Sequence, residues 1–203
     1  MKLIVPSEEF IQRAMDLKAR YDEARNIWAA TMRSVHPPPS CDACDHHGCC
    51  KTIPLALMFE AVVMLVRFQN RPGLVNRLID QGNEMDLVLG DPAAEGSDAR
   101  TAAWVERDEE CVLRRKGQCF GYDVAPLSCR AYFVTTPMEH CCKDHQVAWW
   151  NSGPLKAQAM VEDMKFLRLC TGELPPMDWR PMGAMMGLAV RLANGEELNV
   201  VKK

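Results

Sequence analysis

Ten cysteines in 203 residues, most of them gathered in two stretches, constrain this chain more than any other feature. The first stretch reads Cys41-Asp-Ala-Cys44-Asp-His-His-Gly-Cys49-Cys50. A Cys-x-x-Cys pair lets two thiolates turn back onto one metal ion, because the two intervening residues form a tight turn. Free thiols at this density would be open to oxidation in any cell. The first stretch therefore predicts a metal site.

The second stretch supplies five more cysteines between residues 111 and 142, with few helical periods. We expect Cys111, Cys119 and Cys129 to join the first four, and Cys141 or Cys142 to supply an eighth thiol. Joining segments about 60 residues apart costs only a few kcal/mol of loop entropy, whereas metal–thiolate binding supplies on the order of 10 kcal/mol. The alternative for these thiols, and the one we prefer for Cys170, is that they are small buried side chains.

The spacing leaves the metal open, since zinc, iron–sulfur clusters and Cu(I) all take thiolate-rich sites. The histidines inside or beside the two stretches are second-choice ligands, because loop histidines are more often solvated: His46, His47, His140 and His145. Thirteen methionines suggest copper. Seven of them fall in helical segments, where packing explains them better: Met58, Met64, Met160, Met164, Met182, Met185 and Met186.

Outside the cysteine stretches, apolar residues recur at helical spacing and predict a mainly α fold. We expect a helical single domain with an irregular cysteine-rich metal-binding segment. The predicted helices cover residues 7–33, 55–69, 74–85, 98–104, 154–170 and 181–193. Three parts follow along the chain: an N-terminal helix (1–35), a cysteine-cluster core (36–150), and C-terminal helices packing on that core (151–203).

Charge and hydropathy exclude several classes of protein. A net charge of −3 and a pI near 6.0 give no basic excess for nucleic acid. The most apolar stretch, residues 53–68, contains Glu60 and Arg67 and is too short to span a membrane. No signal peptide is evident, so we expect a cytoplasmic protein. Cysteines in a reducing compartment favour metal binding over disulfides, with an exported disulfide-rich protein as the alternative.

The cysteine pattern resembles the YkgJ-like cysteine-cluster family, a zinc- or iron-chelating domain. The likeness covers residues 41–142 and is most specific in the string Gly117-Gln-Cys119-x2-Tyr122-x3-Pro126-x2-Cys129-Arg130-Ala-Tyr132. This chain differs from the family in having four residues, not two, before the Cys49-Cys50 pair, and Ala125 where the family has arginine. The flagellin lysine methylases look like relatives that carry an iron–sulfur cluster. That resemblance implies only a cluster, since this chain has no recognisable methyl-donor site.

Two residues beside the predicted ligands are candidates for tuning the centre. Tyr122 is expected to bond or cover a cluster sulfur, and Arg130 to offset thiolate charge. The alternatives are an ordinary core aromatic for Tyr122 and a surface salt bridge for Arg130.

The first functional hypothesis is a metal-binding protein with an iron–sulfur cluster, favoured over zinc, serving electron transfer, metal handling or maturation of a partner. The second is a metal-dependent enzyme, although none of the acidic residues near the cysteines is singled out by a motif. The third is an assembly or adaptor subunit that binds a protein partner through apolar helices. The Trp28 helix, Trp149-Trp150 and the Met-rich C-terminal segment are the surfaces it would use.

Overall fold

The computed structural model describes residues 2–36, 48–90, 96–116, 118–131, 134–135, 151–173 and 180–198. Within these ranges the chain forms seven α-helices and two short two-stranded ribbons, so the predicted mainly α fold is confirmed. The helices and 3-10 turns are α1 (Ser7–Val35), η2 (Gly48–Lys51), α2 (Met58–Phe68), α3 (Pro72–Leu89), α4 (Ser97–Glu106), η3 (Tyr122–Val124), α5 (Leu127–Arg130), α7 (Gly153–Thr171) and α8 (Met182–Ala193). The strands are β1 (Leu55–Ala56), β2 (Arg114–Arg115), β3 (Gln118–Cys119) and β4 (Arg180–Pro181).

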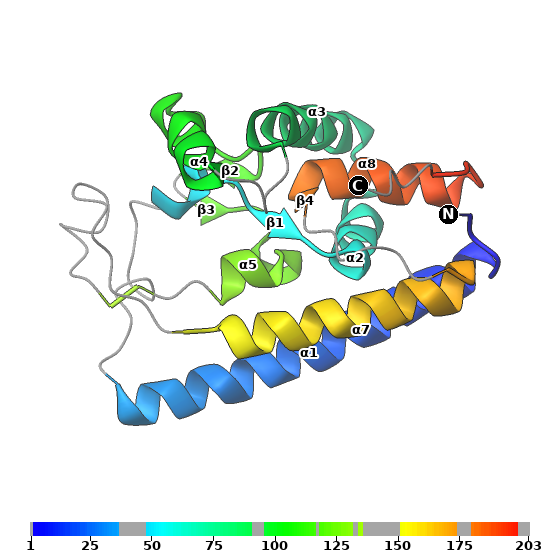
Figure 1. The fold of residues 1–203 in the computed structure, drawn as a ribbon, viewed down its shortest axis with the longest axis horizontal. Helices are drawn as coiled ribbons and strands as arrows, with labels where there is room; N and C mark the ends of the chain where they lie inside the picture. Colours follow the sequence, from blue (N-terminus) through cyan, green and yellow to red (C-terminus); the bar gives the residue numbers. More distant parts are fainter. Residues whose placement is uncertain are drawn as a thin grey trace.

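The helices form layers on either side of α2 (Figure 1). The long helices α1 and α7 lie side by side below it, and α3 and α8 pack together above it. α2 contacts α1, α3, α7 and α8. This position explains why its sequence is apolar nearly all round, since a helix with no solvent-facing stripe is buried on every side.

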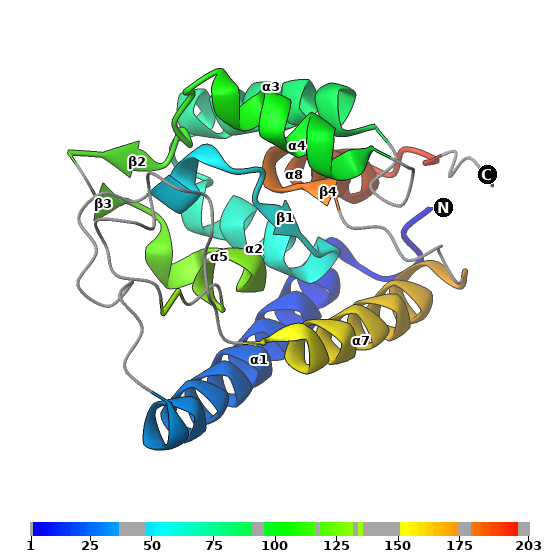
Figure 2. The same ribbon diagram turned by 60° about the vertical axis from the view of Figure 1, so that its left-hand side comes forward.

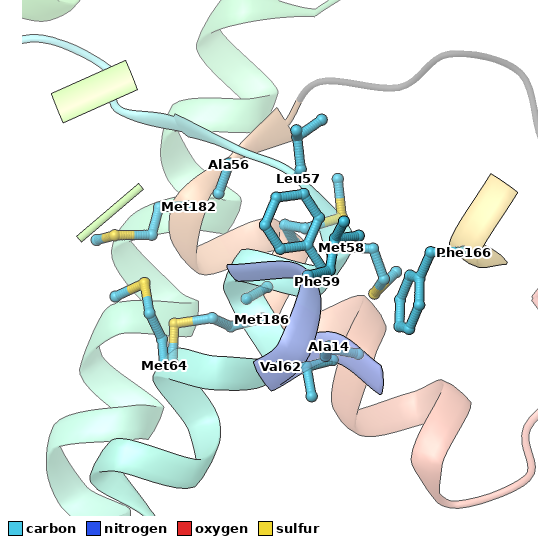
Figure 3. Close-up of a cluster of buried hydrophobic side chains, with 14 of the residues drawn as sticks. Ala14, Ala56, Leu57, Met58, Phe59, Val62, Met64, Phe166, Met182 and Met186 are labelled. Atoms are coloured by element: carbon cyan, nitrogen blue, oxygen red, sulfur yellow. The ribbon is translucent and has the colours of Figure 1, made fainter. Parts of the chain in front are cut away.

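One cluster of buried apolar side chains joins these layers. Figure 3 shows part of it, where Met64 and Met186 lie close together and Phe59 lies beside Met58. On the outer side, the Phe10 and Phe166 rings stack with their centroids 5.2 Å apart and fasten α1 to α7. Of the seven methionines predicted to serve packing, five are buried and two, Met160 and Met164, are half-buried. The buried ones are Met58, Met64, Met182, Met185 and Met186.

Two glycines set the close crossing of α3 and α8. A Cβ on Gly183 would overlap the carbonyl oxygen of Leu78, and a Cβ on Gly82 would overlap the backbone nitrogen of Ala184. The two backbones therefore touch, which only glycine at both positions allows.

The helix predicted over residues 55–69 begins later than expected. Leu55 and Ala56 form a strand that pairs antiparallel with residues 180–181, and α2 starts at Met58. The Met182 N–H donates to the Pro54 carbonyl oxygen (2.7 Å) and continues this pairing. A partner about 125 residues away along the chain overrides the local helical pattern here.

Among the described residues, no helix combines the length and the apolar character that crossing a bilayer requires.

Candidate metal centre

The described side chains include four of the nine predicted cysteine ligands: Cys50, Cys111, Cys119 and Cys129. Outside the described residues lie Cys41, Cys44, Cys141, Cys142, the second-choice histidines, and the side chain of Cys49, whose backbone belongs to η2. The site can therefore be built only from its second half and from the last cysteine of the first stretch.

A backbone hydrogen bond joins the two cysteine stretches directly. The Cys111 N–H donates to the Cys50 carbonyl oxygen at 2.9 Å. The chain then turns, because the Arg114 N–H bonds back to the Cys111 carbonyl oxygen at 2.8 Å. Cys50 and Cys111 thus lie next to each other although 60 residues separate them in the sequence.

A small hairpin brings Cys119 to the same place. β2 and β3 pair antiparallel with Arg114 opposite Cys119, and the Phe120 N–H donates to the Leu113 carbonyl oxygen at 2.8 Å. Lys116 has φ 51°, the left-handed value that tight hairpin turns use. The hairpin therefore returns the chain from Cys111 to Cys119.

The short helix α5 presents Cys129 and is fastened on both sides of it. The Leu127 N–H donates to Glu60 Oε1 at 2.6 Å, and the Ser128 hydroxyl donates to the Leu55 carbonyl oxygen. After the cysteine, the Arg130 guanidinium pairs with Asp22 on α1. A four-residue helix has little intrinsic stability, so these long-range contacts position the thiol. Cys129 itself keeps exposed surface.

The four thiols lie close enough to act on one another electrostatically. The pKa of Cys111 is raised to about 12, chiefly by burial, with smaller contributions from Cys119 and Cys50. Burial, Cys50 and Asp123 raise the pKa of Cys119. Protein atoms surround the Cys129 sulfur and exclude water from it, and this desolvation raises its pKa. Cys111, Cys119 and Cys50 contribute in the same direction. Thiolates gathered in this way repel one another, and a multivalent cation among them would remove that repulsion.

Backbone N–H groups favour the charged form of two of these thiols. Hydrogen bonds from the Leu113 N–H to Cys111 and from the Gly121 N–H to Cys119 lower the pKa of each thiol against the effect of burial. Gly121 is also needed for packing, since a Cβ there would lie 2.9 Å from Phe68 Cζ. N–H donors to sulfur are among the groups by which proteins tune iron–sulfur clusters.

A cation that sequence reasoning missed lies beside Cys129. Lys156, in the first turns of α7, is half-buried; burial lowers its pKa, and the nearby Cys129 and Glu60 oppose that effect. Figure 2 shows the start of α7 beneath α5, which explains the proximity. No sequence motif links residues 129 and 156, since only the fold brings them near each other.

The two residues predicted to tune the centre have different surroundings. Arg130 is largely buried and bonded to Asp22, which Lys18 also contacts, so its ion pair is more enclosed than a surface salt bridge. Tyr122 is 51% exposed, which excludes the ordinary core aromatic. Its expected contact with a cluster sulfur remains a prediction.

Across the described ranges, no three His, Cys, Asp or Glu side chains approach closely enough to form a ready-made metal site. The four described thiols are neighbours without being in ligand geometry around a single ion. The four described cysteines are nevertheless the type of ligand that zinc, iron–sulfur clusters and Cu(I) prefer.

Comparison of the chain with protein-family models, with curated proteins and with solved structures finds no match.

Proposed function

We propose that this protein binds metal through a cysteine-ligated centre, with an iron–sulfur cluster favoured over zinc. The observation that carries the proposal is the convergence of Cys50, Cys111, Cys119 and Cys129 from four separate segments, close enough to raise one another's pKa. The other predicted ligands, Cys41, Cys44, Cys49 and either Cys141 or Cys142, would complete the set. The resemblance to the YkgJ-like family supports the same function.

The donor set favours a thiophilic metal over hard cations such as Mg²⁺ or Ca²⁺, which take oxygen ligands. A bound cluster would supply one-electron redox chemistry, and zinc a structural anchor. The chain's own contribution is to hold the thiols together, to donate N–H groups to sulfur, and to place Lys156 beside Cys129. The thiol protons must leave when metal binds, so binding weakens as pH falls.

The proposed biological role is electron transfer, metal handling or maturation of a partner. These uses share a requirement for a thiol close to the surface, where a partner or an incoming metal can reach it. Cys129 is the exposed residue among the described cysteines, although protein atoms surround its sulfur, and the residues on either side of it are fastened to the fold. It is therefore the proposed point of contact.

Anaerobic purification followed by iron, zinc and acid-labile sulfide analysis tests the proposal. Wild-type protein should retain metal, and Cys111→Ser and Cys129→Ser should each lose most of it. Visible absorbance together with acid-labile sulfide would identify an iron–sulfur cluster. A colourless protein that contains zinc would identify a zinc site instead.

Cys170→Ser is the matched control for these variants. Cys170 carries a free thiol buried in α7, and burial raises its pKa to about 11, but the charges that act on it are Arg13 and Glu9. It should retain wild-type metal content. Wild-type protein without stoichiometric metal, or equal loss in Cys170→Ser and Cys129→Ser, would contradict the proposal.

A further inference from the structure

Several cations gather around one aromatic ring beside the cysteines. The guanidinium of Arg71 lies 4.4 Å from the centroid of the Phe120 ring, and that of Arg115 lies 5.8 Å from it. The Phe120 ring stacks on Phe68, with 6.0 Å between centroids, and Arg67 lies over Phe68 at 5.9 Å. We call the exposed residues Arg67, Arg71, Arg115 and Lys116, with Phe120, the arginine–phenylalanine patch.

Most of the positive charge in this patch is unneutralised. Arg67 pairs with Asp123 at 2.9 Å, and both side chains are about half exposed. Arg71, Arg115 and Lys116 have no ion pair with any residue in the described part of the chain. Keeping like charges close together is electrostatically unfavourable, and carboxylates on a partner would relieve it through bidentate bonds to arginine.

The patch borders the thiol cluster. Phe120 directly follows Cys119, and Arg115 and Lys116 belong to the hairpin that places Cys119 beside Cys111. A molecule seated on the patch would therefore contact the hairpin that carries Cys119. Arginine and aromatic residues are also the side chains most enriched in protein interfaces.

We propose that the arginine–phenylalanine patch is the docking surface for a protein partner with an acidic surface. The patch is small, so the complex is expected to be transient and to depend on charge, as in encounters between electron carriers. The chain's net charge of −3 makes an extended polyanion such as nucleic acid a poor fit, because its remaining phosphates would face an acidic protein. A compact cluster of carboxylates engages the patch without that repulsion.

The test measures binding of a short fluorescein-labelled tetraglutamate peptide, a compact cluster of carboxylates, by fluorescence anisotropy at low salt. Wild-type protein, the double variant Arg71→Gln/Arg115→Gln and a control, Arg20→Gln/Arg168→Gln, are compared. The control removes equal charge from exposed arginines on α1 and α7. Circular dichroism and thermal unfolding establish that all three proteins are folded.

Removal of Arg71 and Arg115 should weaken binding roughly tenfold, since exposed charge pairs contribute up to about 1 kcal/mol each. The control should stay within about twofold of wild type, and added salt should weaken wild-type binding. Equal weakening in the control, or no salt-sensitive binding by wild type, would overturn the proposal. Tighter binding of a single-stranded oligonucleotide of the same charge through these arginines would assign the patch to nucleic acid instead.

The peptide probe responds to charge, and the three proteins are compared at equal metal content, so the effect of the arginines is separated from that of the metal. A failure here leaves the metal analysis intact, and a failure of the metal analysis leaves the docking surface intact.

Discussion

Two buried carboxylates hold the N-terminal end of α2. Asp163 on α7 accepts hydrogen bonds from the Met58 and Phe59 N–H groups at 3.1 and 3.0 Å. Glu60 accepts the Leu57 N–H at 3.0 Å as well as the Leu127 N–H of α5. These groups satisfy backbone donors that the helix itself leaves without partners, and the positive end of the helix dipole favours acidic side chains there.

Because both carboxylates are buried, we predict that the free energy of unfolding falls as the pH rises from 5 to 8. Burial raises the pKa of Glu60 from 4.5 to about 7, and that of Asp163 from 3.8 to about 7. In this window the folded state binds more protons than the unfolded state, so the stabilisation present at low pH is lost as pH rises through 7. The loss should be on the order of a few kcal/mol in total, measured by urea unfolding at several pH values.

Asp163→Asn should reduce this pH dependence by about half, because the amide does not titrate whereas Glu60 still does. Glu162→Gln is the matched control, since Glu162 is the neighbouring residue on α7 and pairs with Lys165 at the surface. It should leave the slope unchanged. A stability that rises from pH 5 to pH 8 would refute the assignment.

At the scale of the helices, the α3–α8 crossing depends on its glycines. Gly183→Ala places a methyl group against the Leu78 carbonyl oxygen, so the two helices must separate. We expect a loss of about 3 kcal/mol or more, or failure to fold.

Gly187→Ala in the same helix is the control, since its Cβ would lie 3.3 Å from a side-chain methyl, Ile79 Cγ2, and would overlap no backbone atom. The gain in helix propensity offsets this contact, so its stability should stay within about 1 kcal/mol of wild type. Urea unfolding followed by circular dichroism compares the two variants. Equal stability of both would show that the crossing tolerates a side chain.

The same helices show what the sequence can predict. Apolar periodicity locates α1, α3, α7 and α8 to within a few residues, because a helix is specified by neighbours three and four positions apart, and a predicted capping residue, Asp98, locates α4. Leu55 and Ala56, by contrast, form a strand only because a partner about 125 residues away pairs with them. Local patterns do not contain such distant contacts.

The candidate site likewise contains residues that the sequence predicts and residues that it does not. Cysteine spacing identified Cys50, Cys111, Cys119 and Cys129, which the fold brings close together. Lys156 was missed because no motif surrounds it and only the folded chain brings it near enough to Cys129 for the two charges to act on each other. The Asp22 partner of Arg130 was missed for a similar reason, since the two residues are 108 positions apart.

In the whole molecule, the helices and the cysteine segment draw their stability from different sources. α1, α2, α7 and α8 contribute most of the buried apolar cluster, whereas residues 111–131 add only Leu113, Leu127 and Ala131 to its fully buried members. Buried apolar area is the main source of stability. The cysteine segment therefore depends on polar contacts and, under the proposed function, on metal.

Metal removal should accordingly loosen the cysteine segment and spare the helices. Treatment with a chelator under anaerobic conditions should speed amide hydrogen exchange in residues 111–131 by about tenfold or more, with little change in α1 or α2. Exchange followed by mass spectrometry measures both regions in one sample. The chelator should not change the exchange of Cys129→Ser. An equal increase in exchange rate along the whole chain would contradict the difference between the helices and the cysteine segment.

The capping of α2 by Asp163 also bears on how the protein is made. Met58 and Phe59 are synthesised more than 100 residues before the carboxylate that receives their N–H groups. A nascent chain therefore cannot finish its central helix until the sequence of α7 has left the ribosome, and contacts this distant slow folding. Until then its apolar surface is exposed, which favours aggregation.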